Sequence, residues 1–178
     1  MKFVKYVLIF SASILLLIVV GGLLLPSQYK IERNININSS ISEVENYIID
    51  LRKWEQWSYM SSRKDTSIVF NYQQNNIGPH SSAKWKSDFM GEGILRIYDY
   101  KPAQNIYYEL IIQENDHKIN GTFFIDSTEK GINVRWLDYG DLGINPIARI
   151  FGLFMEKYIG QDQENSLNEL KKVIERND

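Results

Sequence analysis

The stretch ININSSISEVENYIIDLRKWEQWS, residues 35–58, decides the fold. Ile35 and Ile37 end a segment in which apolar and polar residues alternate from about residue 29, which predicts a half-buried strand. Ser40, with Glu43 three residues later, forms the capping box that begins many helices. Apolar residues then recur at helical spacing at Ile41, Val44, Ile48, Leu51 and Trp54. The stretch therefore predicts a strand, a capped amphipathic helix and an aromatic corner.

Six further segments, with strand-like patterns, follow this corner. They are residues 66–72, 81–87, 94–100, 106–113, 118–126 and 132–139. The connections are short turns, including one at 114–117, and have no helical pattern, so consecutive strands must run antiparallel. Together with the first strand, they predict a meander of about seven strands.

Alternation within these segments selects the side chains that face inward. The inward set is Ala83, Trp85, Leu95, Ile97, Ile106, Tyr108, Leu110, Ile112, Ile119, Phe123, Ile125, Val134 and Trp136. Gly93 and Gly121 share this phase, where a glycine can permit a bend or leave space. In the first strand the same rule turns Arg33 inward beside Ile35.

A long helix is predicted at the C-terminal end. Asn145 is a good N-cap, and Pro146 suits the first helical position. An apolar face is expected at Ile147, Ile150, Phe151, Phe154, Tyr158, Leu167, Leu170 and Ile174. Some thirty residues make roughly 45 Å of helix, enough to lie across most of the sheet.

The N-terminal region predicts a membrane segment. Residues 6–25 contain no charge, and twenty helical residues span roughly 30 Å, one hydrocarbon thickness. A cleaved signal peptide has a shorter apolar region and a small-residue cleavage site, and LLLPSQYK offers no such site. We therefore expect an uncleaved anchor and linker over residues 1–28, followed by one domain over 29–178. Because Lys2 and Lys5 precede the span, the expected orientation is N-terminus cytoplasmic and domain extracytoplasmic.

The order of these elements resembles the START-like, polyketide cyclase and dehydratase superfamily (SRPBCC), in its membrane-anchored subset. The resemblance lies in residues 35–58, in GPHSSAKWKS and GEGILRIYDYKPAQNIYYEL, in the Gly-Thr-Phe and Val-x-Trp strands, and in the long last helix. It implies an α+β helix-grip fold, in which a curved antiparallel sheet surrounds the C-terminal helix. It also implies an apolar cavity between sheet and helix. The family corner usually reads Trp-Ser-Pro, whereas Ser58 is followed here by Tyr59 and Met60.

The cavity implied by the resemblance would be lined by inward residues of the strands and of the last helix. These are Trp85, Leu95, Ile97, Tyr108, Phe123, Trp136, Gly152, Phe154 and Met155. Its mouth would lie at Trp57, Tyr59 and Met60, and Arg33 or Tyr108 would supply a polar contact for a ligand. The alternative for each aromatic residue is that it only fills the core.

Composition excludes several classes of function. The net charge is −2, and because Lys2 and Lys5 are the only charges before Lys30, the remainder carries −4; a nucleic-acid partner would require a basic face. The chain has no cysteine, which removes thiolate chemistry and disulfides. His80 and His117 stand 37 positions apart, without metal-site spacing, so neither a metal nor a cofactor is expected. Acidic pairs such as Asp138 and Asp141 are interpreted as solvated charge.

Three functions fit this sequence. The first is a membrane-tethered, non-enzymatic binding domain for a lipid or another hydrophobic small molecule, with protein partners undefined. The second is a cyclase-like or hydratase-like enzyme in the same cavity, for which Tyr108, Arg33 and Asp138 are the candidate polar groups. The third is a structural envelope protein whose cavity is vestigial, which would show a packed interior and an exposed apolar patch.

Overall fold

A computed structural model describes residues 2–73, 75–113 and 117–176; most of the predicted turn at 114–117 and both chain ends lie outside these ranges. The elements are α1 (Lys2–Leu24), β1 (Gln28–Ile37), α2 (Ile41–Ile49), the 3-10 turn η1 (Leu51–Lys53), α3 (Trp54–Trp57), β2 (Val69–Tyr72), β3 (Ser82–Ser87), β4 (Gly91–Lys101), β5 (Asn105–Ile112), β6 (His117–Thr128), β7 (Gly131–Asp141) and α4 (Pro146–Glu175).

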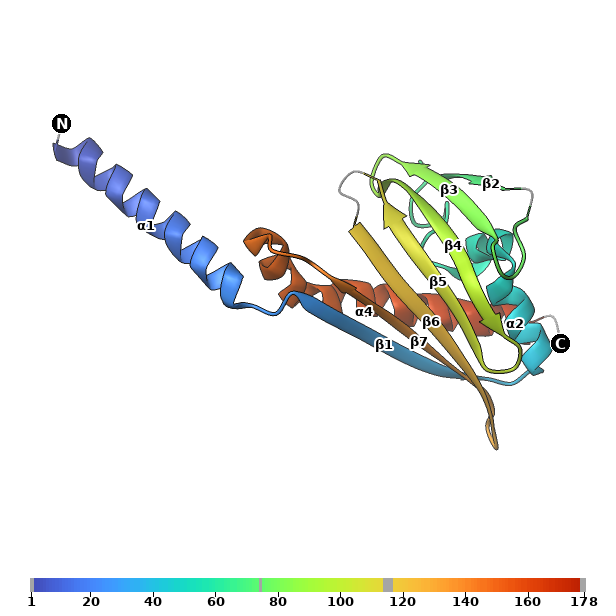
Figure 1. The fold of residues 1–178 in the computed structure, drawn as a ribbon. Coiled ribbons are helices and arrows are strands. Elements are labelled where there is room, and N and C mark those ends of the chain that lie inside the picture. The colour runs from blue at the N-terminus through green and yellow to red at the C-terminus, as the bar shows by residue number, and fades with distance from the viewer. Residues whose placement is uncertain (1, 74, 114–116, 177–178) are drawn as a thin grey trace.

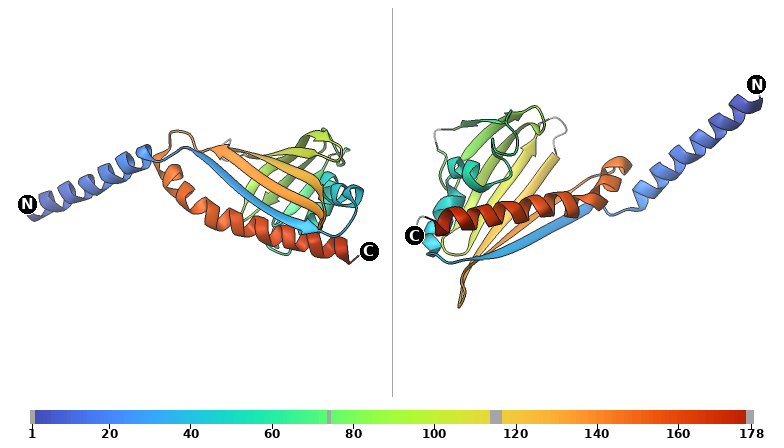
Figure 2. Two further views of the ribbon diagram at one scale, coloured as in Figure 1. Left: turned by 90° about the horizontal axis from the view of Figure 1, so that it is seen from below. Right: turned by 180° about the vertical axis from the view of Figure 1, so that it is seen from behind.

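The strands form one antiparallel sheet in the order β1-β7-β6-β5-β4-β3-β2. β1 pairs with β7 along its whole length, from Gln28 opposite Asp141 to Ile37 opposite Ile132. The other neighbours follow chain order. The curved sheet lies along one side of α4 (Figures 1 and 2), so the predicted α+β helix-grip architecture is confirmed.

The aromatic corner packs under α2 and is held by its two indole groups. Ser40 caps α2, its Oγ accepting from the Glu43 backbone N–H at 3.2 Å. The indole N–H of Trp54 donates to the Ile48 carbonyl at 2.8 Å, and that of Trp57 donates to the Tyr47 carbonyl at 3.1 Å. These bonds satisfy carbonyl groups at the end of the helix that would otherwise lack partners. Both tryptophans are therefore packing residues that fix the corner to α2.

The two halves of α4 bury different faces. In the second half, residues 161–175, the side chains of Leu167, Leu170 and Ile174 are buried in the core. In the first half, residues 146–160, the apolar residues Ile147, Phe151, Phe154 and Tyr158 are exposed. Tyr158 and Leu167 are nine residues apart, or about 2.5 turns, so the two apolar sets lie on roughly opposite sides of the helix. The prediction of one continuous apolar face was therefore wrong.

Helix α1 is the candidate membrane span, and its end contacts the start of α4. Residues Phe3–Leu24 form a helix long and apolar enough to cross a membrane, and it is almost entirely exposed. Gly22 lies against Pro146, where an added Cβ would stand 2.4 Å from the Pro146 carbonyl oxygen. Arg149 Nη1 donates to the carbonyls of Leu23 and Leu25 at 3.0 and 3.1 Å. The first turn of α4 is thus fastened to the end of the span.

Candidate functional site

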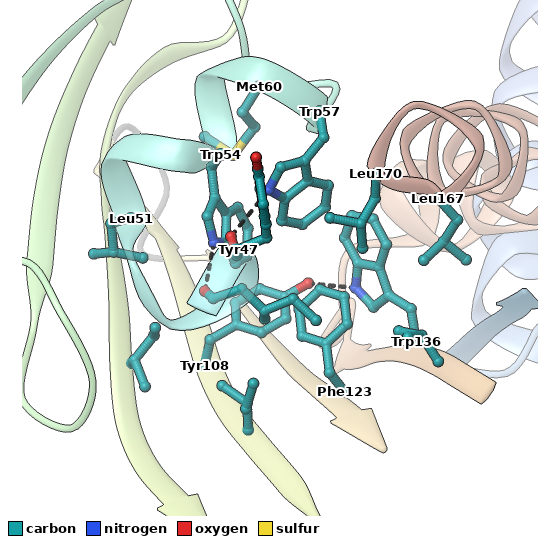
Figure 3. Close-up of a cluster of buried hydrophobic side chains, with 14 of the residues drawn as sticks. Tyr47, Leu51, Trp54, Trp57, Met60, Tyr108, Phe123, Trp136, Leu167 and Leu170 are labelled. Carbon is teal, nitrogen blue, oxygen red and sulfur yellow. Dashed lines mark hydrogen bonds between the residues drawn. The ribbon is translucent and has the colours of Figure 1, made fainter. Parts of the chain in front are cut away.

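The interior beneath the corner is filled by aromatic side chains of the protein itself. Six predicted lining residues belong to the buried core: Trp85, Leu95, Ile97, Tyr108, Phe123 and Trp136. The ring of Trp54 lies 5.2 Å from that of Tyr108, between centroids, and the ring of Trp57 lies 5.9 Å from that of Trp136. Figure 3 shows these rings packed between the strands and α4. The corner residues therefore occupy the place where the sequence predicted a cavity.

A polar group lies at the edge of this aromatic core. Asp138 on β7 is buried, with 1% of its surface exposed. The Tyr108 hydroxyl donates to Asp138 Oδ1, and the Trp136 indole N–H donates to Tyr108 Oη at 2.7 Å and to Asp138 Oδ1 at 3.0 Å. The Gln163 amide approaches the same carboxyl from α4, yet neither of its polar atoms reaches normal hydrogen-bond geometry with any described residue. The interpretation of Asp138 as a solvated charge was wrong.

The groups around Asp138 do not balance the charge of its carboxylate. Burial raises the pKa of the Asp138 carboxyl to about 6, although hydrogen bonds from Tyr108 and Trp136 and the nearby Gln163 amide act to lower it. All three partners are neutral. A buried carboxylate without a cation destabilises a fold, and such groups concentrate at functional sites.

Two more tyrosines feel the charge of Asp138. Burial, with a smaller contribution from that charge, raises the pKa of both Tyr29 and Tyr59 above the usual range. Tyr29 Oη lies 3.4 Å from His117 Nε2, and the two rings stack. Burial lowers the pKa of His117, which favours a neutral imidazole. Tyr29 and His117 therefore form a polar pair at the ends of β1 and β6.

His117 lines a pocket between the first half of α4 and the ends of β6 and β7. The pocket has a volume of about 390 Å³ and is lined by His117, Leu142, Asn145, Ala148, Phe151 and Met155. This volume lies within the usual range for small-molecule sites. We call it the α4 pocket. It combines apolar side chains with two polar ones, next to the junction of α4 with α1.

A second pocket of about 390 Å³ lies between the corner and the second half of α4. Tyr59 forms part of its wall, stacks on Trp136 and donates its backbone N–H to Ser166 Oγ at 2.9 Å. Its rim carries ion pairs of Lys64 with Asp162 and of Arg63 with Glu169. We call it the corner pocket; unlike the α4 pocket, it has charged side chains at its rim.

Several residues predicted to line the cavity or its mouth have other positions in the structure. Arg33 does face α4, but its Nη1 forms an ion pair with Glu156 Oε1 at 2.8 Å instead of pointing into a cavity. Trp57 and Met60 are almost fully buried, so they belong to the core and not to a mouth. Phe154 is 50% exposed on the outer side of α4, because the apolar face changes sides. Gly152 and Met155 are half-buried, and Met155 lines the α4 pocket.

Tyr29 and His117 were not predicted as site residues, but a signal for Tyr29 is visible in the alternation. Tyr29 has the same phase in β1 as Ile31, and it pairs with Gly140, whose missing side chain leaves room for the tyrosine ring. His117 begins β6 beside a turn, where neither spacing nor phase distinguishes it.

Known proteins resemble this chain in fold but not in sequence. No family model and no curated protein matches the chain. Among solved structures, the di-domain ARO/CYC protein StfQ from the steffimycin biosynthetic pathway is similar over 84% of this chain and 51% of its own, with a TM-score of 0.64 and 9% identity. KanY is similar over 83% and 98%, with a TM-score of 0.61 and 12% identity. Protein CV1439 from Chromobacterium violaceum is similar over 84% and 99%, with a TM-score of 0.57 and 12% identity.

At these identities the likenesses define a class of fold. The part of the chain after α1 shares its α+β fold with these solved structures. That fold serves many activities, so function must be argued from the site.

Proposed function

We propose that the protein is a membrane-tethered binding domain for a hydrophobic small molecule or lipid, held between the sheet and α4. The observation that carries the proposal is the α4 pocket, in which apolar side chains stand beside His117, the partner of Tyr29. An apolar body would lie against Leu142 and Met155. A hydroxyl or amine group on the ligand would bond to His117.

The position of the pocket supports uptake from a membrane. It lies at the end of the domain that contacts α1 through Arg149. A poorly soluble ligand is concentrated in the bilayer, so a pocket next to the span shortens its path through water.

Photolabelling tests this function. The full chain, in lipid nanodiscs, is exposed to a fatty alcohol that carries a diazirine, and labelled peptides are mapped by mass spectrometry. We expect label on the peptides containing Leu142 and Met155 as well as on α1. Because one neutral hydrogen bond contributes about 0.5–1.5 kcal/mol, Tyr29→Phe should reduce pocket labelling by roughly twofold to tenfold and leave α1 labelling unchanged.

The matched control is Tyr139→Phe, which removes a phenol hydroxyl from an exposed residue of β7. It should change neither signal. Label confined to α1 in the wild-type protein would contradict the binding function and favour a structural role.

Asp138 favours a second candidate, an enzyme of the cyclase or hydratase kind. A carboxyl whose pKa lies near 6, next to a phenol, is suited to proton transfer at neutral pH. The molecules extracted from wild type and from Asp138→Asn distinguish the candidates. A binding domain yields the same molecule from both, whereas an enzyme yields an unconverted molecule from the variant.

A further inference from the structure

The first half of α4 carries an apolar stripe on the side away from the sheet. Ile147, Phe151, Phe154 and Tyr158 are 57%, 68%, 50% and 65% exposed, and their spacing of four, three and four residues places them on one side of a helix. Ile144, just before the helix, is exposed as well. The sheet lies along one side of α4 (Figure 2), and the buried Leu167, Leu170 and Ile174 lie on roughly the opposite side of the helix from these residues. We call these five residues the outer stripe.

The outer stripe exposes apolar surface to water, which is unfavourable. Several large apolar side chains grouped on one face usually mark a surface that contacts a protein or a membrane. The same side of the helix becomes polar at residue 161, with Gln161, Asp162 and Asn165. The stripe therefore ends within the helix, about 22 Å from its start at 1.5 Å per residue.

The end of α1 lies beside the start of the stripe. Arg149 and Pro146 fix the first turn of α4 to Gly22, Leu23 and Leu25 at the end of α1. The stripe thus begins where the exposed apolar surface of the candidate span ends. The exposed apolar surfaces of α1 and of the first half of α4 therefore adjoin at this contact.

The charges of the two halves of α4 fit this arrangement. The first half has the basic residues Arg149 and Lys157 and one acidic residue, Glu156, which is paired with Arg33. The second half has four acidic and two basic residues. Lys157 flanks the stripe, whereas Arg149 lies on the opposite side of the helix and bonds to α1. A basic residue beside an apolar face is suited to the headgroup region, whereas an acidic helix is repelled by anionic lipids.

We propose that the outer stripe docks on the lipid bilayer, so that the first half of α4 lies in the headgroup region and the second half rises out of it. The occupant is the membrane that holds α1, not a second copy of the chain or another protein. This inference rests on the tether in the proposed function. It adds that the domain is held against the bilayer by a second contact, beside the α4 pocket, which shares Phe151 with the stripe.

Single spin labels test the docking, because the chain has no native cysteine and each introduced cysteine gives one labelled site. Phe154→Cys reports on the stripe and Asn165→Cys, eleven residues further along the same side of α4, is the matched control. Leu16→Cys reports on α1. Each nitroxide-labelled full chain is placed in nanodiscs of mixed neutral and anionic phospholipid, and its collisions with oxygen and with a water-soluble nickel chelate are measured.

At position 154 we expect collisions with oxygen to exceed those with the nickel chelate, and at position 165 the reverse. A label at 154 as open to nickel as the one at 165, while the label at 16 is in lipid, would overturn the docking and leave the tether intact. Nickel access at 16 would overturn the tether itself. A label at 154 shielded from both reagents, with spin broadening that vanishes on dilution with unlabelled protein, would indicate a second copy and also overturn the proposal.

Discussion

The two halves of α4 use apolar residues for different purposes. The second half inserts Leu167, Leu170 and Ile174 into the core and presents polar residues to water. The first half exposes its apolar residues and contacts α1 at its beginning. One continuous helix therefore has a half that packs in the core and a half that presents apolar residues at the surface. The buried carboxyl of Asp138 lies next to the second half, near Gln163.

The largest expected effect comes from truncating one apolar residue in each half. Leu170→Ala removes a fully buried side chain and should lower the free energy of unfolding by about 2–5 kcal/mol. Phe154→Ala should change it by less than about 0.5 kcal/mol, as is usual for surface positions. Denaturant titrations of the full chain in detergent micelles, followed by tryptophan fluorescence, measure both. Equal losses would remove the distinction between the halves.

The next largest effect is expected at the Asp138 carboxyl, which lies beside the second half of α4. Below about pH 4 Asp138 is protonated in both folded and unfolded states and does not affect stability. As the pH rises to 6, the unfolded chain ionises while the folded protein keeps the proton, so stability is lost. Asp138→Asn should therefore stabilise the protein above pH 6 by up to about 3 kcal/mol, because the pKa of this carboxyl is raised to about 6 in the folded protein. Thermal unfolding at pH 4 and pH 7.5 checks this.

Asp141→Asn is the control for that experiment and should have the opposite sign. The Gly143 backbone N–H donates to its carboxylate at 2.8 Å, and this bond is the main reason that the pKa of Asp141 is lowered. Asp141→Asn should therefore destabilise the protein at pH 7.5 and have little effect on stability well below pH 4. A destabilising Asp138→Asn at pH 7.5 would show that the buried carboxylate is better compensated than its contacts indicate.

The smallest effect is expected at the ion pair between the second half of α4 and the corner. Lys64→Ala breaks the pair with Asp162 and should cost no more than about 1 kcal/mol, because exposed ion pairs contribute little. The loss should shrink in 1 M salt, where screening is strong. Lys157→Ala in the first half, which removes a lysine that lies over the Tyr158 ring, should show no such salt dependence. Melting temperatures of both variants at low and high salt decide the matter.

The fold could be predicted from the sequence because its signals are local. The capping box at Ser40, the alternation in each strand and the N-cap at Asn145 each determine structure within a few residues. The register between β1 and β7 joins residues about a hundred positions apart and could be inferred only through the family resemblance.

The site could be predicted only in part. Periodicity predicted which strand residues are buried, but not that Trp54 and Trp57 would fill the space between them, because that depends on how the corner folds back. The other two errors could have been avoided from the sequence. Asp138 follows Trp136 by two residues and so shares its inward face, and the nine-residue step from Tyr158 to Leu167 moves the apolar face to the other side of the helix.

The central claim is that a hydrophobic molecule occupies the α4 pocket, and native mass spectrometry of the full chain released from nanodiscs tests it most directly. Met155→Trp places a larger ring in the pocket, whereas Phe154→Trp makes a similar change one residue away on the exposed side. The account predicts one bound small molecule on wild type and on Phe154→Trp, and none on Met155→Trp. Equal occupancy of all three proteins, or a wild-type protein that carries nothing, would contradict it.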